Sequence, residues 1–189
     1  TTYSAHVPYI GNDMCEVLKE KYPNLVSSDE EVSCIRLLAH ETDDFLKLLL
    51  QRLEEDDYLD NTVIVLFADH YAYGLNNVEI IKGEDDSNLL QKTPLIIWSN
   101  DIEGKNIDTI VDTASIPVTL FNMFGIEYDP KMYMGMDVFS KDYQNFVYFS
   151  DYNWYDGEVY SKYTLEDDYV RDISGIVNKK IDINEKIIT

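Results

Sequence analysis

The feature that most constrains the fold is a continuous apolar, β-branched run, Thr62-Val-Ile-Val-Leu-Phe67. A strand that is apolar on both faces is typical of the middle of a parallel sheet whose faces are covered by helices. A second run of this kind, Leu95-Ile-Ile-Trp98, follows Thr93-Pro94, and proline is tolerated where a strand starts. Together the two runs predict an α/β fold with a mostly parallel sheet flanked by helices.

A long amphipathic helix is predicted from Asp29 to Asp57, because apolar residues recur there mostly at three- and four-residue spacing with charged residues between them. The apolar face is expected to contain Val32, Ile35, Leu38, Phe45, Leu46, Leu49 and Leu53.

A shorter helix is predicted within Val111–Phe124. Thr113 or Ser115 is expected to cap it, Pro117 fits the first turn, and Gly125 stands at the expected end.

The C-terminal part of the chain predicts an antiparallel hairpin. Two aromatic-rich runs, Phe146–Tyr155 and Glu158–Thr164, flank Asp156-Gly157, a dipeptide that supports the positive φ angles of a two-residue type I′ turn. The tail from Asp167 to Thr189 is predicted to be helical.

Composition excludes some classes of function. The chain has 189 residues, of which 36 are acidic and 15 basic, and its net charge of -21 repels the phosphates of nucleic acids. No run approaches the roughly 20 apolar residues of a membrane helix, so the chain as it stands is expected to be soluble. Spacing alone leaves open whether Cys15 and Cys34 pair.

The strongest candidate for chemistry is the pair Asp69-His70, which comes directly after the first apolar run. Open α/β sheets assemble their sites at the carboxyl ends of strands. A carboxylate beside an imidazole suits a divalent transition metal, which polarises a phosphoryl or sulfuryl oxygen. The structural alternative is that Asp69 caps a turn and His70 is an ordinary loop residue.

The other two histidines differ in their surroundings. His6 precedes Val7-Pro8, and the proline forces an extended or turning backbone there. In such a loop His6 either donates a hydrogen bond to an anionic oxygen or is an ordinary solvent-exposed side chain. His40 lies within the long predicted helix, and we interpret it as structural.

Four acidic runs, at 29–31, 54–57, 84–86 and 166–168, are interpreted as solvated faces and loop ends, since none has the ligand pattern of a calcium loop. The aromatic residues of the hairpin are interpreted as cross-strand packing in preference to a sugar-stacking surface. They are Tyr148, Tyr152, Trp154, Tyr155, Tyr160 and Tyr163.

Several of these segments, taken in order, resemble the C-terminal half of the sulfatase-like domain of lipoteichoic acid synthases, in the alkaline-phosphatase superfamily. The segments are 1–9, 59–71, 92–98, 112–126 and 133–140, and their order is far more specific than any one motif. The resemblance implies a single domain over 1–189. It would form a partial alkaline-phosphatase-like sandwich with a C-terminal antiparallel hairpin.

The resemblance also implies roles for site residues. Asp69 and His70 would bind a divalent metal, which is usually Mn²⁺ in that family, and His6 would contact the phosphate of the substrate. The implied parent enzyme transfers glycerol phosphate, or a similar head group, from a lipid donor through a covalent phospho-threonine, on the extracellular face of the cell membrane. Its nucleophile and an acidic metal ligand are expected upstream of Thr1, so this chain by itself is expected to be inactive.

The sequence departs from the family pattern at one position, and it leaves other functions open. Ala68 stands where the family usually has glycine before its Asp-His pair. The missing nucleophile leaves a sulfate-ester or phosphate-ester hydrolase of the same superfamily open, as well as a non-catalytic cell-surface module. Membrane attachment is expected only through N-terminal segments, and the open strand edge of a partial sheet predicts self-association.

Overall fold

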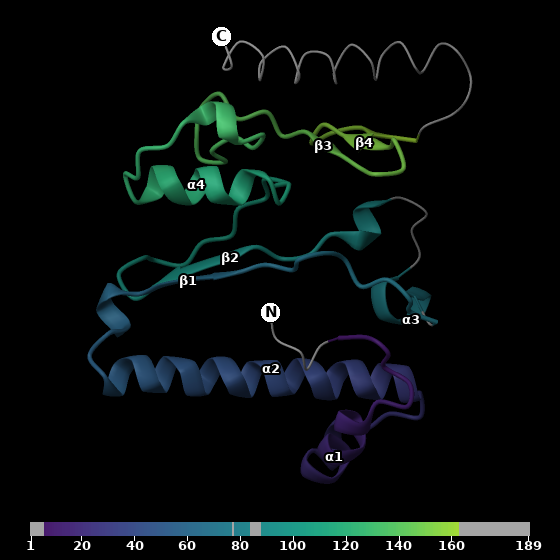
Figure 1. Ribbon diagram of the computed structural model, residues 1–189. Coiled ribbons are helices and arrows are strands. Elements are labelled where there is room, and N and C mark those ends of the chain that lie inside the picture. Colours follow the sequence, from purple (N-terminus) through teal and green to yellow (C-terminus); the bar gives the residue numbers. More distant parts are fainter. Residues whose placement is uncertain (1–5, 77, 84–87, 163–189) are drawn as a thin grey trace. The chain divides into compact units, whose positions relative to one another are not determined.

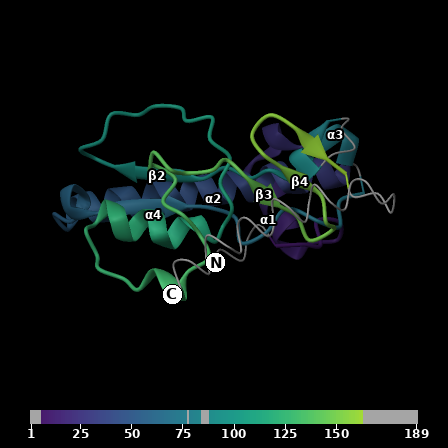
Figure 2. The same cartoon turned by 90° about the horizontal axis from the view of Figure 1, so that it is seen from above.

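The computed structural model describes residues 6–76, 78–83 and 88–162. The chain divides into two compact units, Thr1–Lys105 and Asn106–Thr189, which are described in turn. Figures 1 and 2 show the helices and strands of both units. The expectation of a single domain stays a prediction.

The first unit begins with α1 (Asp13–Lys21), which starts after Asn12. The Asn12 side chain accepts a hydrogen bond from the Met14 amide at 3.0 Å, and so satisfies one of the unpaired amides of the first turn. A 3₁₀ turn at Pro23–Leu25 then leads towards the second helix.

The second helix, α2 (Glu30–Glu55), confirms the long helix predicted from Asp29 to Asp57. Asp29 caps it, and its carboxylate accepts from the Val32 amide at 2.9 Å. The start of α2 therefore follows from local chemistry.

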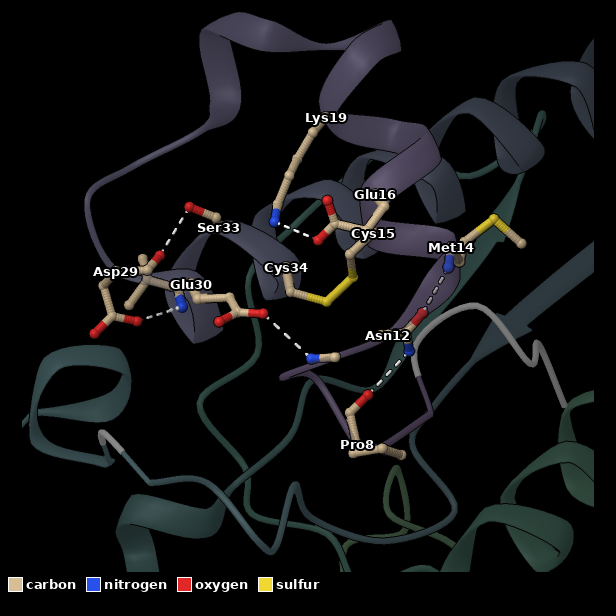
Figure 3. Close-up of a disulfide and its surroundings, with 12 residues drawn as sticks. Pro8, Asn12, Met14, Cys15, Glu16, Lys19, Asp29, Glu30, Ser33 and Cys34 are labelled. Carbon is tan, nitrogen blue, oxygen red and sulfur yellow. Dashed lines mark hydrogen bonds and ion pairs between the residues drawn. A yellow bond between two sulfur atoms is a disulfide. The ribbon is translucent and has the colours of Figure 1, made fainter.

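A small core joins α1 to α2, and Figure 1 shows α1 beside the N-terminal end of α2. Its buried residues are Cys15, Leu18, Cys34, Leu37 and Leu38. Cys15 and Cys34 form a disulfide, with Cα atoms 5.3 Å apart, that ties the two helices together (Figure 3).

The buried face of α2 differs from the predicted one. Phe45 is 49% exposed, because the core that covers α2 lies near its start. Glu31, which sequence analysis placed on a solvated face, is only 2% exposed. Its spacing to Cys34 and Leu38 puts it on the same face of the helix as these core residues.

Both predicted apolar strands are present, as β1 (Val63–Leu66) and β2 (Ile96–Ser99). They pair antiparallel, with Val63 opposite Ser99 and Leu66 opposite Ile96. This pairing corrects the expectation of a mostly parallel sheet, because every strand pair in the described part of the chain is antiparallel.

The connection between the two strands gives the physical reason. A parallel pair needs a crossover of a dozen or more residues that is usually a helix. The described part of this connection contains α3 (Val78–Lys82) and a 3₁₀ turn at Asn88–Gln91, both much shorter than such a helix. An apolar, β-branched run indicates a strand, but it carries no information on strand direction; here β1 is only half-buried and Ile96 of β2 is exposed.

The second unit contains α4 (Ser115–Met123), which confirms the short helix predicted within Val111–Phe124. Neither predicted cap is used, because the N-cap is Ala114, which makes no side-chain capping bond; the Ser115 amide donates instead to the Asp112 carboxylate at 2.9 Å. Two hydroxyls of α4 then hold the segment that follows, since Ser115 accepts from the Met136 amide and Thr119 from the Val138 amide, both at 3.1 Å.

The end of α4 confirms the prediction made for Gly125. This glycine has a φ of 61°, the left-handed conformation that ends many helices. Its amide donates to the Asn122 carbonyl at 3.2 Å, and the Ile126 amide donates to the Phe121 carbonyl at 2.8 Å. These two bonds together make a Schellman motif.

The predicted hairpin is a three-stranded antiparallel sheet of β3 (Val147–Tyr148), β4 (Trp154–Tyr155) and β5 (Tyr160–Ser161). The first predicted run is broken into two strands near Tyr152, which has a φ of 68°. The predicted helix in the tail, Asp167–Thr189, lies outside the described residues.

The turn between β4 and β5 contains Asp156-Gly157 but is wider than predicted, because Tyr155 pairs with Tyr160. The Asp156 carboxylate accepts from the amides of Glu158 at 3.0 Å and Val159 at 2.7 Å, and so favours a four-residue loop.

The prediction of aromatic packing in this region is confirmed, and the contacts include Phe146 and Tyr152, which lie outside the strands. The rings of Phe146 and Trp154 stack with centroids 5.9 Å apart, and those of Tyr148 and Tyr152 meet edge to face at 6.5 Å.

Candidate functional site

The candidate site begins where β1 ends. The strand stops at Leu66, and two residues later the chain enters the loop that holds Asp69 and His70. Both side chains reach solvent, with exposed fractions of 63% for Asp69 and 50% for His70. The pair therefore lies at the carboxyl end of the strand, as predicted, and is accessible to a ligand.

Asp69 and His70 also contact each other. The Asp69 Oδ1 accepts a hydrogen bond from the His70 amide at 3.0 Å and lies 3.7 Å from His70 Nε2. Two atoms bound to one divalent ion at roughly 2.0–2.2 Å lie about 3–3.5 Å apart. A small adjustment therefore brings both side chains to a single ion.

The second ring nitrogen of His70 determines which tautomer is present. Nδ1 lies 2.8 Å from the carbonyl oxygen of Tyr71. A carbonyl oxygen only accepts, so Nδ1 carries the proton and Nε2 of the neutral ring keeps its lone pair. Metal-binding histidines have this arrangement, in which the second nitrogen donates to a carbonyl or carboxylate. The two residues therefore fit a metal as part of its ligand set.

One aromatic ring of the loop lies against His70, and a second ring packs on the first. The Tyr73 ring lies 4.8 Å from the His70 ring at an angle of 34°, and Tyr71 meets Tyr73 edge to face at 6.2 Å. The Lys82 Nζ lies 5.9 Å from the Tyr71 ring, and burial lowers the pKa of this lysine. A partly buried cation is thus close to the loop that carries the Asp-His pair.

The same loop is tied to the start of α2. The Asn76 amide donates to both carboxylate oxygens of Glu31 at 2.9 Å, and the Asn76 side chain donates to Oε1 at 3.1 Å. Sequence analysis missed both residues. The spacing of Glu31 to Cys34 and Leu38 was a signal for its burial, whereas no local signal links it to a residue 45 positions away.

His6 lies in the loop before α1, where the Val7–Pro8 peptide bond is cis. Its side chain is exposed, and Nδ1 lies 2.5 Å from the carbonyl oxygen of Val7. Hydrogen bonds hold the end of this loop that precedes α1, where the Asn12 side chain donates to the Pro8 carbonyl at 2.9 Å (Figure 3).

The structure does not add His6 to a metal-binding group with Asp69 and His70. Across residues 6–76, 78–83 and 88–162, no three His, Cys, Asp or Glu side chains come together in a group able to hold a metal ion. The metal site and the phosphate contact of His6 stay predictions.

Comparison with known proteins identifies the family to which this chain belongs. The family model described as Sulfatase matches residues 1–126, which include His6, β1, Asp69 and His70. The chain belongs to the sulfatase family. The matched residues also include β2 and α4, whose segments were part of the predicted resemblance.

Three curated relatives extend this result, and all three carry the name lipoteichoic acid synthase. Lipoteichoic acid synthase 2 of Bacillus subtilis is 23% identical over 169 residues, which are 79% of this chain and 26% of that protein. Lipoteichoic acid synthase of Staphylococcus saprophyticus is 27% identical over 132 residues, 62% of this chain and 20% of that protein. Lipoteichoic acid synthase 1 of Bacillus subtilis is 26% identical over 194 residues, 97% of this chain and 29% of that protein.

This sulfatase-family chain spans 20 to 29% of the length of these relatives. The predicted resemblance to a lipoteichoic acid synthase-like sulfatase domain is confirmed. Within the described residues, no helix is both long enough and apolar enough to cross a membrane.

Proposed function

We propose that the chain is part of a metal-dependent enzyme that transfers phosphoglycerol, or a similar phosphorylated head group, from a lipid donor. Membership of the sulfatase family and similarity to proteins named lipoteichoic acid synthase support this assignment. The observation that carries it is the contact between Asp69 and His70 at the end of β1, in which His70 Nε2, the nitrogen that keeps its lone pair when the ring is neutral, lies 3.7 Å from Asp69 Oδ1.

Asp69 and His70 would hold a divalent ion, and Mn²⁺ is the ion proposed. Such an ion polarises a phosphoryl oxygen and offsets the repulsion between an anionic substrate and a chain of net charge -21. Two ligands do not complete a divalent site. The remaining ligands, including an acidic one, are proposed to lie in a segment N-terminal to Thr1.

The nucleophile is proposed to be a threonine in that same segment. Its oxygen forms a bond to phosphorus while the bond from phosphorus to the lipid oxygen breaks, and the threonine proton goes to the departing alcohol. The acceptor hydroxyl then forms a bond to phosphorus while the bond from phosphorus to the threonine oxygen breaks, and the proton of the acceptor goes to the departing threonine oxygen. In both steps His6 is proposed to contact a phosphate oxygen and so to hold the group in place. Because its Nδ1 faces the Val7 carbonyl, donation to the phosphate comes from Nε2 of the doubly protonated ring.

The proposed location is the extracellular face of the membrane. The Cys15–Cys34 disulfide supports it, because disulfides persist in oxidising compartments and are rare in the cytosol. Attachment to the membrane would come from segments N-terminal to this chain.

A second candidate is hydrolysis of a sulfate or phosphate ester, which the Sulfatase family model favours. The nucleophile separates the two candidates, since a threonine favours phosphoryl transfer and a cysteine or serine that is oxidised during maturation favours a sulfatase. Sequencing the gene upstream of Thr1 identifies that residue.

Titration with Mn²⁺, followed by electron paramagnetic resonance, tests the metal site. Asp69→Asn is expected to weaken binding at least about tenfold, because it removes a charged ligand. The matched control is Asp43→Asn, which makes the same change at an exposed position of α2. An ionic strength of about 0.15 M screens loose binding to the acidic surface. Equal binding by wild type and Asp69→Asn would instead support a non-catalytic module.

A further inference from the structure

Glu31 is a buried carboxylate whose bonds lead to the loop of the candidate site. It is 2% exposed and lies in the first turn of α2. Both of its oxygens accept from the Asn76 amide at 2.9 Å, and Oε1 also accepts from the Asn76 side chain at 3.1 Å. A charge is costly to bury unless hydrogen bonds satisfy it, so these bonds hold the two segments firmly together.

The position of Glu31 makes the charge tolerable. The first turn of an α-helix carries a partial positive charge, which favours a carboxylate there. The Glu31 charge also acts on Tyr9, in the loop that contains His6. Burial and, after it, the negative charge of Glu31 raise the pKa of the Tyr9 hydroxyl. Glu31 therefore lies close to both loops that contain predicted site residues.

A short path connects Asn76 to the ring of His70. The backbone turns at Gly74, which has a φ of 74°, so that Asn76 reaches α2 while Tyr73 stays against His70. Tyr73 packs on the His70 ring at 4.8 Å, and the Tyr71 carbonyl accepts from His70 Nδ1 at 2.8 Å. The contacts that orient the imidazole thus belong to a loop of six residues, 71–76, whose far end is fixed by Glu31.

We propose that Glu31 is a positioning residue, which holds the loop 71–76 through Asn76 and thereby orients the His70 ring with Nε2 towards Asp69. The functional meaning of this orientation rests on the proposed metal site. The structural claim, that the tautomer and orientation of His70 depend on Glu31, is independent of any metal.

Nuclear magnetic resonance of the full 189-residue chain without metal tests the structural claim. In Glu31→Gln, the Asn76 amide is expected to exchange with solvent about tenfold faster, because a charged acceptor is replaced by a neutral one. The population of His70 with the proton on Nδ1, read from the ring nitrogen shifts, is expected to fall. Wild-type exchange and wild-type ring shifts in this variant would overturn the proposal.

The matched control is Glu30→Gln, the same change one residue earlier on α2. Glu30 accepts from the Gly11 amide at 3.2 Å, so this variant is expected to alter the exchange of Gly11 and leave Asn76 and His70 as in wild type. An equal change at His70 in both variants would also overturn the proposal, because the effect would then come from the helix charge in general. If Glu31→Gln does not fold, Asn76→Pro replaces it, because proline removes both the amide and the side-chain donor at this position, and unchanged His70 shifts in that variant contradict the inference.

The Mn²⁺ titration then separates the two claims. If wild type binds Mn²⁺, Glu31→Gln is expected to bind it roughly tenfold more weakly, as found for residues that orient metal ligands. If wild type binds no Mn²⁺, the proposed metal site is wrong, while the exchange and ring shifts still decide whether Glu31 positions His70.

Discussion

His70 Nε2 lies 3.7 Å from Asp69 Oδ1, while Nδ1 of the same ring donates to the carbonyl of Tyr71. The first contact joins neighbours in the sequence, and such neighbours meet in many loops. The second contact selects a tautomer that leaves Nε2 with a lone pair. The Tyr73 ring lies against the imidazole, with the two ring centroids 4.8 Å apart.

Tyr73→Leu is expected to weaken Mn²⁺ binding by roughly tenfold, because the His70 ring loses the neighbour that restrains it. Stability is expected to change by less than about 1 kcal/mol, since Tyr73 is 50% exposed. Titration and urea unfolding measure the two effects. Tyr58→Leu, at a position that is 63% exposed, is the control and is expected to leave Mn²⁺ binding unchanged. Wild-type affinity in Tyr73→Leu would show that the ring contact does not matter.

Replacing both Cys15 and Cys34 by alanine is expected to lower the free energy of unfolding by about 3 kcal/mol, the value for a loop of this length. The disulfide restricts the unfolded chain, and the variant also loses buried sulfur atoms from the core. Urea denaturation followed by circular dichroism measures the change. Dithiothreitol is expected to lower the free energy of unfolding of the wild type but not that of the variant. An equal decrease in both proteins would contradict this account.

Gly135→Ala is expected to destabilise the second unit by about 1–3 kcal/mol, because overpacking forces the backbone to move. A Cβ at this position would meet the carbonyl of Ala114 and the Cα of Ser115, at the start of α4. Gly104→Ala is the matched control, since nothing lies within 4 Å of its added Cβ. Equal thermal midpoints for the two variants would disprove the close contact.

Tyr143 is expected to make stability fall at high pH. Burial, and after it the charge of Asp112, raises the pKa of Tyr143 to about 12 from the ordinary value of 10.0. Its hydroxyl donates to the Ile110 carbonyl at 2.8 Å, a bond that ionisation removes. The folded-state pKa is the higher one, so this contribution is complete below pH 10 and is lost as the pH rises through 12. Tyr143→Phe should lack this loss in unfolding experiments between these pH values, and an identical slope in wild type and variant would refute it.

The 189-residue chain alone is expected to release no head group from a phosphatidylglycerol donor in vesicles. Phosphoryl transfer needs an activated nucleophile, which is proposed to lie N-terminal to Thr1. Chromatography of the products measures the release, with His70→Ala as the background. Release by the wild-type chain above that background would place the nucleophile within these residues.

Much of the fold was predictable, because the signals are local. The start of α2 follows from the Asp29 cap, and the end of α4 follows from Gly125 in the left-handed conformation. The position of Asp69-His70 at the end of β1 was also predictable, since an apolar run marks a strand and the residues after it mark the carboxyl end.

The sequence by itself thus determined the start of α2, the end of α4 and the two adjacent side chains that stand at the end of β1. Tertiary structure alone decided the antiparallel direction of β1 and β2, the pairing of Cys15 with Cys34, and the bond between Glu31 and Asn76. The physical reason is the separation along the chain. Caps and turns act within a few residues, whereas these three relationships join segments 19 or more residues apart, and only the folded path of the backbone brings them together.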